Sequence, residues 1–153
     1  IHDATAARIP RAYPLSVFDE AVRDLHAIGI EVIVHLILGL PGETAADMEA
    51  SARYVGRCSA EGVKLHLLHI LHGTPMAAEY AAGRVRTLEL DEYITLLERC
   101  LEVLPPEVAI HRLTGDAPKR DLIAPLWSAD KKRVLNAIRQ RFESDDLIQG
   151  SKL

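Results

Sequence analysis

Apolar residues recur at helical spacing in several parts of the chain. We expect Ser16 to cap a helix whose apolar residues share one face, with Gly29 at its end. Thr44, followed three residues later by Asp47, resembles a capping box at the start of another helix. The same spacing and similar end signals predict further helices over 74–83, over 91–104, in a short piece near 120–126, and after Ser128.

Short apolar runs between these helices predict buried strands. The runs 31–39 and 63–71 are almost wholly apolar, which is typical of strands covered on both faces. A third strand is expected over 108–113. Strands and helices alternating at these spacings predict right-handed βαβ units and a parallel sheet, hence an α/β protein. Three strands are too few for a (β/α)₈ barrel, which needs about 250 residues. The fold is therefore either a small three-layer sheet or part of something larger.

The composition is that of a globular domain: 153 residues, 48% hydrophobic and 26% charged, with a formal net charge of −4. No apolar run approaches the roughly 18 residues of a membrane-spanning helix, and there is no signal peptide, so we expect no membrane partner. The chain does not begin with Met and is expected to be an excerpt. Cys58 and Cys100 are too few for a disulfide framework, which predicts core thiols in a reducing compartment, the cytoplasm.

Charge is distributed unevenly along the chain. Residues 112–141 carry eight basic and three acidic side chains, whereas residues 1–111 carry nine basic and sixteen acidic ones. The basic zone 112–141 is either a solvated face or a patch that follows the phosphates of a nucleic acid. Arg112 ends the third predicted strand and is suited to recognise phosphate or carboxylate; alternatively it pairs with Asp116 to close a loop.

Two glycines lie where the first predicted strand runs into a helix. Gly39 and Gly42 would let backbone approach a ligand at the carboxyl end of a parallel strand. A plain turn that needs positive φ explains them equally well. The glycine spacing matches neither a P-loop nor a dinucleotide-binding fingerprint.

Histidines are unusually frequent on the predicted strands. Because side chains alternate along a strand, His66 and His69 should point to opposite faces, so we expect no metal site there. His35 and His66 would instead point into a common interior if their strands are neighbours, where both could line a pocket.

Three stretches resemble, in order and spacing, the later part of an uncharacterised bacterial radical S-adenosylmethionine (SAM) family. That family is related to the oxygen-independent coproporphyrinogen oxidases and to the radical enzyme of the Elongator complex. The stretches are HLILGLPGET (35–44), VKLHLLHILHGTPM (63–76) and LEVLPPEVAIHRLTGDAPKRDLIAPLW (101–127).

The resemblance implies the later part of a partial (β/α)₆ TIM-like barrel, followed by a C-terminal α/β extension. Residues 1–104 would be the C-terminal half of the barrel, and 105–153 the extension, a strand plus helices. In such enzymes a [4Fe–4S] cluster transfers an electron to SAM, which fragments to a 5′-deoxyadenosyl radical that abstracts a hydrogen atom from substrate. The resemblance also implies two groups of site residues: Ile37, Gly39, His69 and Ile70 for cofactor binding, and His35, His66 and Arg112 in the substrate pocket.

The chain lacks the three-cysteine motif that holds the cluster and the first four strands of such a barrel. We therefore expect the chain alone to bind neither SAM nor a cluster and to be inactive. Its expected partners are the missing N-terminal half of the barrel and, through an open sheet edge along 31–38, a second copy of itself. Two alternatives stay open: a module that binds RNA, tRNA in particular, through 112–141, and a small self-contained α/β domain of unrelated function.

Overall fold

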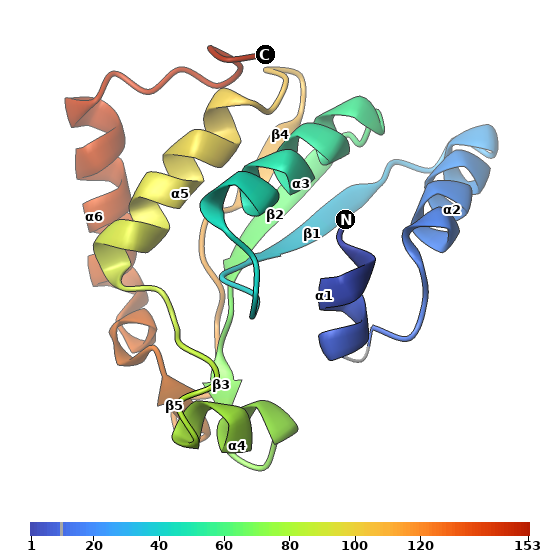
Figure 1. The fold of residues 1–153 in the computed structure, drawn as a ribbon. Helices are drawn as coiled ribbons and strands as arrows, with labels where there is room; N and C mark the ends of the chain where they lie inside the picture. Colours follow the sequence, from blue (N-terminus) through green and yellow to red (C-terminus); the bar gives the residue numbers. More distant parts are fainter. Residues whose placement is uncertain (10) are drawn as a thin grey trace.

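The computed structural model describes residues 1–9 and 11–153 (Figure 1). Helices and strands alternate along most of the chain, as the apolar spacing predicts. The elements are α1 (Asp3–Arg8), α2 (Leu15–Ala27), β1 (Ile33–Leu38), α3 (Ala45–Arg57), β2 (Gly62–Leu67), β3 (Ile70–Leu71), α4 (Pro75–Ala81), α5 (Leu90–Glu102), β4 (Ala109–Arg112), β5 (Leu122–Ala124), the 3-10 helix η1 (Leu126–Ala129) and α6 (Lys131–Ser144).

Strands β1, β2 and β4 form a parallel sheet in that spatial order. Each strand is added on the same side of the one before it, so right-handed crossovers place their helices on a single face. In Figure 1, α3 and α5 lie side by side over that face, and α6 packs against α5. A barrel wall has this one-sided layering, whereas a doubly wound sheet carries helices on both faces. The predicted α/β class with a parallel sheet is confirmed.

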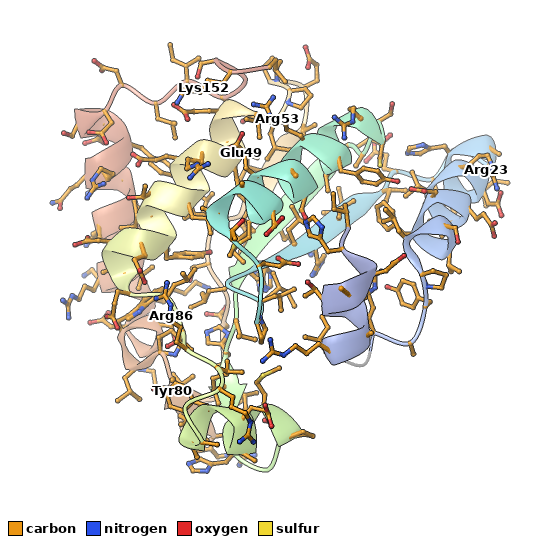
Figure 2. All side chains as sticks on the ribbon, in the orientation of Figure 1. Arg23, Glu49, Arg53, Tyr80, Arg86 and Lys152 are labelled. Carbon is orange, nitrogen blue, oxygen red and sulfur yellow. The ribbon has the colours of Figure 1, made fainter. Side chains whose placement is uncertain are left out.

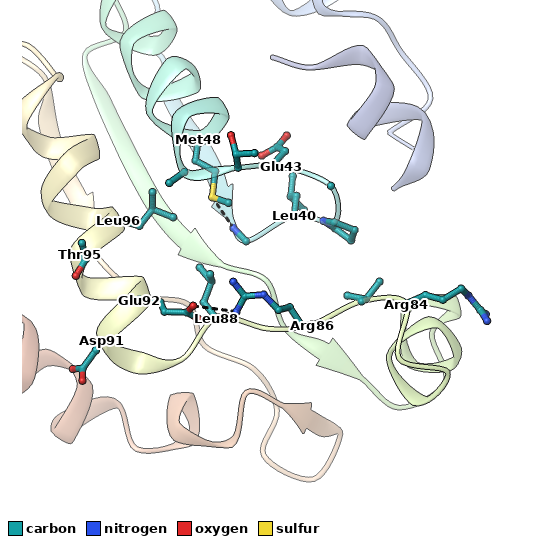
Figure 3. Close-up of a pocket in the computed structure, with 16 residues that line it drawn as sticks. Leu40, Glu43, Met48, Arg84, Arg86, Leu88, Asp91, Glu92, Thr95 and Leu96 are labelled. Atoms are coloured by element: carbon teal, nitrogen blue, oxygen red, sulfur yellow. Dashed lines mark hydrogen bonds and ion pairs between the residues drawn. The ribbon is translucent and has the colours of Figure 1, made fainter.

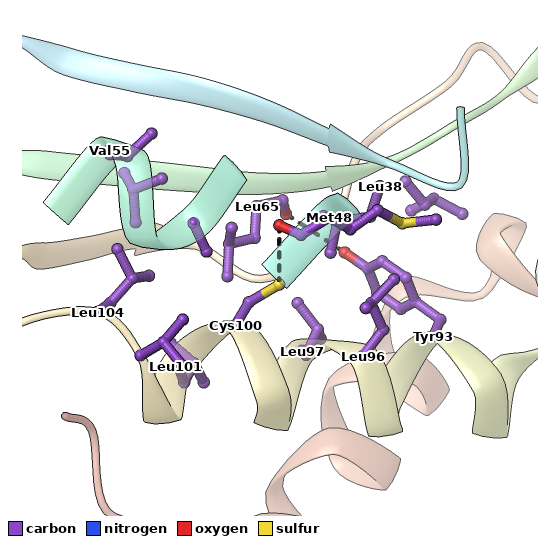
Figure 4. Close-up of a cluster of buried hydrophobic side chains, with 14 of the residues drawn as sticks. Leu38, Met48, Val55, Leu65, Tyr93, Leu96, Leu97, Cys100, Leu101 and Leu104 are labelled. Carbon is purple, nitrogen blue, oxygen red and sulfur yellow. Dashed lines mark hydrogen bonds between the residues drawn. The ribbon is translucent and has the colours of Figure 1, made fainter. Parts of the chain in front are cut away.

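Apolar side chains on alternate strand residues point toward the helices. Those of β1 are in register with those of β2 as follows: Val34 with Val63, Leu36 with Leu65, and Leu38 with Leu67. Leu97, Cys100 and Leu101 of α5 pack into the same core (Figure 4). Burying one such Leu or Val side chain contributes roughly 1.5–3 kcal/mol, so this layer is the main source of stability.

The opposite face of the sheet, called the open face below, is not covered by any helix of the described residues. The residues on this face are Ile33, His35 and Ile37 of β1, Gly62, Lys64 and His66 of β2, and His111 and Arg112 of β4. Ile37 is 44% exposed although it lies within an apolar strand. The expectation that 31–39 is covered on both faces is therefore wrong, because both crossovers return on the same side.

Strand β1 forms one edge of the sheet, along the segment predicted to be open. One side of β1 pairs with β2 over its whole length, and no strand among the described residues pairs with its other side. The backbone N–H and C=O groups on that side are a template for another strand.

Two helix starts differ from the prediction. The caps at Thr44 and Thr74 are present, and Thr44 forms a full capping box with its partner. Helix α2, however, starts after Pro14, whose fixed φ suits an extended cap residue. Asp130 caps α6, because its carboxylate accepts a hydrogen bond from the third helical N–H while Ser128 is held in the preceding 3-10 turn.

The strand predicted over 63–71 is interrupted. Strand β2 ends at Leu67, and Ile70 begins β3, which pairs antiparallel with β5 in a second, small sheet. Residues 122–124, predicted within a short helical piece, are therefore a strand. Pairing between distant segments determines both the break after Leu67 and the strand at 122–124. A run of three apolar residues is too short to show either helical or strand spacing.

The C-terminal segment crosses back over α3 and α5. Lys152 forms an ion pair with Glu102 at 2.7 Å, and its carbonyl oxygen accepts a hydrogen bond from Arg53 at 2.9 Å. Figure 2 shows Arg53 and Glu49 on α3 and Lys152 in the C-terminal segment. Among the described residues, no helix combines the length and apolar character needed to cross a membrane.

Candidate functional site on the open face

Three basic or imidazole side chains form a row across the open face. His35 of β1 is in register with Lys64 of β2, and Lys64 is in register with Arg112 of β4. Residues in register on neighbouring parallel strands point to the same face, so these three side chains are adjacent. The structure thus brings together the predicted pocket residues His35 and Arg112, with a lysine between them.

An irregularity in β4 places Arg112 in this row. The register between β2 and β4 shifts after Val63, so that one residue of β4 has no direct partner. A bulge of this kind re-aims side chains and is common beside functional sites. The His111 ring lies over Gly62, where a Cβ would be 2.6 Å from the imidazole. Arg112 also faces the open side, where its charge lowers the pKa of His35. His111 and Arg112 therefore share one face.

His66 and His69 also lie together, contrary to the prediction that they point to opposite faces. A Cβ on Gly115 would be 2.6 Å from Cε1 of His69 and 3.6 Å from Nδ1 of His66, so both rings border this glycine. The prediction is wrong because β2 ends at Leu67, and the alternation of side chains ends with it. The Nε2 atoms of both histidines are buried and lack a hydrogen-bond partner among the described residues.

Burial and neighbouring cations lower the pKa of His35 and His66, which favours the neutral form of both rings. Burial lowers the pKa of His35, and the charges of Lys64 and Arg112 lower it further. Burial also lowers the pKa of His66, aided by His35, whose ring centroid is 5.3 Å away. Neutral imidazoles can each donate and accept a hydrogen bond.

Asp116 is the acidic side chain next to this group. It accepts a hydrogen bond from Lys131 at 2.8 Å, which lowers the pKa of its carboxyl, and Arg112 lies 4.0 Å from the same oxygen. The predicted Arg–Asp pair is thus present, but Lys131 makes the closer contact. One carboxylate is shared by two cations.

The turn that follows β1 borders a pocket of about 610 Å³ (Figure 3). Gly39 and Gly42 have φ of +86° and +89°, so the turn needs glycine at both places. The N–H of Gly39 points to Sδ of Met48 at 3.1 Å, and Arg86, paired with Glu92, lines the other side. This pocket lies beside the N-termini of α3 and α5, and none of the open-face residues lines it.

The residues predicted to bind the cofactor lie at the ends of β1 and β2. Ile37 is on the open face, and the strand ends are joined by a hydrogen bond from the N–H of Leu68 to the carbonyl oxygen of Leu38 at 2.9 Å. His69 follows at once, bordering Gly115. The Ile70 side chain is fully buried in the small cluster between β3 and β5, so only its backbone is suited to a contact.

The cysteines of this chain do not fit an iron–sulfur cluster, which needs closely spaced thiolates. Cys58 is half-buried at the end of α3, and Cys100 is buried in the core on α5, where burial raises the pKa of its thiol to about 12. Within residues 1–9 and 11–153, no three His, Cys, Asp or Glu side chains are grouped to hold a metal ion.

Most cations of the basic zone 112–141 have an acidic partner. Five of its eight basic residues have a carboxylate oxygen within 4.0 Å: Arg112, Arg120, Lys131, Arg139 and Arg141. For Lys119, Lys132 and Arg133 there is no such pair among the described residues. The zone is therefore less basic at its surface than its composition suggests.

One functional candidate was missed from the sequence. Lys64 did not stand out because a single lysine within an apolar strand is usually an edge or solvent position. The available signal was its spacing, since it lies two residues before His66 and therefore on the same face.

Comparisons with known proteins identify the family and the fold. Residues 60–144 match the family described as the Radical_SAM C-terminal domain, and the chain belongs to this family. The radical SAM resemblance seen in the sequence is thereby confirmed. The chain is 41% identical over 150 residues to the uncharacterized protein YtqA of Bacillus subtilis, which covers 98% of this chain and 47% of that protein. It is 34% identical over 152 residues to protein YhcC of Escherichia coli, covering 99% of this chain and 49% of the other.

The chain thus spans about half the length of the curated relatives it matches. A more distant relative is the tRNA uridine(34) acetyltransferase of Dehalococcoides mccartyi, 27% identical over 139 residues, which are 89% of this chain and 29% of that protein. Among solved structures, an archaeal Elp3 from Methanocaldococcus infernus with an N-terminal deletion matches with a TM-score of 0.84 at 18% identity, covering 97% of this chain and 35% of that one. At this identity the likeness shows the fold.

Proposed function

We propose that this chain is the later part of a radical SAM enzyme barrel, and that its open face lines the barrel interior. The one-sided layering of the sheet carries this proposal, because a wall with helices outside and polar side chains inside is half of a barrel. The match to the Radical_SAM C-terminal domain and the half-length alignments support it. They favour it over a small self-contained domain of unrelated function.

In this proposal the first partner is the earlier half of the barrel, which pairs with the free side of β1. The edge position of β1 supports this, as does the exposed apolar surface around it, where Ile28 is 71%, Ile30 46% and Ile37 44% exposed. Without that partner, the same edge would pair two copies of this chain. The free thiols Cys58 and Cys100 suit a reducing compartment.

The open face supplies two sets of contacts in this proposal. The ends of β1 and β2 would hold SAM, with Ile37 and Gly39 on one side of the adenine and the backbone near His69 and Ile70 on the other. His35, His66 and Arg112 would face the substrate. The cluster, whose ligands must come from outside this chain, and SAM together supply hydrogen-atom abstraction. The role of this chain is to orient the reactants and exclude water.

A chimera tests this proposal. The aligned segment of the Bacillus subtilis relative is replaced by this chain, and the product is reconstituted anaerobically with iron and sulfide. With dithionite as reductant, we expect it to convert SAM to 5′-deoxyadenosine and methionine. The reasoning fails if the chimera folds and carries a cluster but forms no 5′-deoxyadenosine while the unmodified relative does.

A matched pair of variants in the chimera locates the SAM site. Ile37→Lys should slow SAM cleavage, because it places a charge where the adenine is expected. Ile148→Lys is the control, since Ile148 is 67% exposed in the C-terminal segment, away from the open face. Equal effects of the two changes would argue against the assignment of Ile37.

RNA binding is a second candidate function, supported by the net charge of 112–141 and by the name of the Dehalococcoides relative, which acts on tRNA uridine(34). Lys119, Lys132 and Arg133 would make the phosphate contacts. A tRNA gel-shift at low salt tests it. Binding should weaken steeply as salt rises, and Lys132→Met combined with Arg133→Met should reduce the salt dependence. Absence of any shift at low salt would remove this candidate.

A further inference from the structure

The row across the open face places like charges next to one another. Lys64 and Arg112 are in register on neighbouring strands, and His35 follows on the other side of Lys64. Like charges directly opposite in a sheet are destabilising. Asp116 offsets only part of this, since it lies 4.0 Å from Arg112 and is held more closely by Lys131. Lys64 has no ion-pair partner among the described residues.

A second, independent observation points the same way. His66 lies one step along the sheet from this row, in register with Ile37, and its Nε2 atom is buried with no hydrogen-bond partner in the described part of the chain. Leaving a buried polar atom unpaired costs free energy, and such atoms are rare in folded proteins. A positively charged row beside an unpaired imidazole nitrogen is the arrangement expected of a site that awaits a polar, negatively charged group.

We propose that the row formed by His35, Lys64 and Arg112 binds an anionic group, a phosphate or a carboxylate, of the molecule on which the enzyme acts. The arginine fork and the lysine ammonium would contact its oxygens, and the neutral His35 ring would donate a further hydrogen bond. His66 would pair its free nitrogen with a neighbouring polar atom of the same molecule. This deepens the proposed function, on which it rests for the identity of the reaction.

The location of the row separates it from the expected SAM contacts. Ile37 and Gly39 lie two and four residues beyond His35, toward the carboxyl end of β1. On β1 and β2 the row therefore lies farther from the strand ends than these contacts do, while Arg112 is the last residue of the shorter β4. An anion there would fix one end of the substrate while the part that reacts extends toward the strand ends.

The test uses the 153-residue chain and two probes, inorganic phosphate and malonate, which stand for phosphate and carboxylate ligands. The ring C–H signals of the histidines are followed by NMR at pH 7 and low salt. We expect saturable shifts for His35 and His66 but not for His26, which lies on α2. Bound anion should also raise the pKa of His35, because it offsets the charges of Lys64 and Arg112 that lower it. The stronger probe identifies the chemistry of the ligand.

Two variants and a control make the test specific. Lys64→Met and Arg112→Gln should each weaken binding of the stronger probe about fivefold, the effect of losing roughly 1 kcal/mol of a partly screened charge contact. Arg23→Gln on α2 is the control, because the Arg23 side chain is exposed and away from the open face, and it should leave binding unchanged. The urea midpoint of Lys64→Met should equal or exceed that of the parent, because this change removes like-charge repulsion. Weaker binding together with undiminished stability is not expected of a merely structural lysine.

The proposal is overturned if neither probe shifts His35 and His66, or if Arg23→Gln weakens binding as much as Lys64→Met does. These outcomes are independent of SAM cleavage. A chimera that cleaves SAM while this chain ignores both anions would refute the anion site alone. Anion binding without SAM cleavage in the chimera would refute the proposed enzyme and leave the anion site standing.

Discussion

The Tyr93 hydroxyl lies within hydrogen-bond distance of backbone carbonyls at two parts of the sheet. Removing this hydroxyl should give a measurable loss of stability. Tyr93 is fully buried on α5, and its Oη lies 3.0 Å from the carbonyl oxygen of Leu113 and 3.3 Å from that of Leu65. In Tyr93→Phe the ring still fills its space, so no large cavity forms. The loss is one buried hydrogen bond together with the desolvated carbonyls that it leaves, about 1–2 kcal/mol.

Urea unfolding measures this loss, with the fluorescence of Trp127 as the signal. Trp127 is the single tryptophan of the chain, and its ring centroid lies 5.6 Å from that of Tyr93. We expect the midpoint to fall by about 0.5–1 M at an unchanged slope. Tyr13→Phe is the control, because Tyr13 is 47% exposed, and it should change stability by less than about 0.5 kcal/mol. Equal midpoints for the Tyr93 variant and the parent would refute the bridging role.

The same residue predicts a difference at high pH. Burial raises the pKa of Tyr93 above its ordinary value of 10.0. The unfolded chain therefore loses this proton at a lower pH than the folded protein, so the contribution of Tyr93 is complete below pH 10 and decreases above it. Phenylalanine has no proton to lose. The gap in stability between parent and Tyr93→Phe should accordingly narrow above pH 10, as urea midpoints across the pH range would show.

Three further predictions concern the helical layer. Thr44→Ala removes the capping box of α3 and should cost about 1 kcal/mol in urea unfolding; no loss would mean that the cap is dispensable. Hydrogen bonds from Arg99 lower the pKa of the Glu49 carboxyl, so this bridge between α3 and α5 should stabilise the protein above the ordinary Glu pKa and be lost as pH falls below it. In Glu49→Gln the free energy of unfolding should therefore decrease less than in the parent as pH falls below the ordinary Glu pKa. An equal decrease in both proteins would contradict this. Ellman's reagent should label Cys58 before Cys100. Cys100 should react only on unfolding, because it is buried and its thiol pKa is raised. Simultaneous labelling of the two thiols would count against this.

The helical layer and the parallel sheet could be predicted from the sequence because they follow from local rules. Thr44 and Thr74 carry the side chains that cap a helix, and both do so in the structure. Buried strands between amphipathic helices leave few arrangements besides βα units. At the last helix the prediction of Ser128 as the cap is wrong, since Asp130, an equally good cap residue two positions later, caps α6.

The site depends on features that local pattern does not determine. The end of β2 at Leu67 brings His66 and His69 to the same glycine, and the shifted register of β4 turns Arg112 toward Lys64. Both follow from pairing between segments far apart in the sequence. The sequence of one strand does not show where its neighbour ends or shifts register. The contacts among these side chains could therefore be found only in the structure.

Because helices cover one face of the sheet, alternate residues of β1 and β2 have different roles: one set packs in the core, and the other lies on the open face. Leu36 and Leu65 secure the fold, and substitutions there would open a cavity beneath α3 and α5. Between them, His35 and Lys64 carry charge and hydrogen-bonding groups that the core does not need. The polar residues of the open face can therefore change one at a time with little cost to folding, while the core beneath them stays the same.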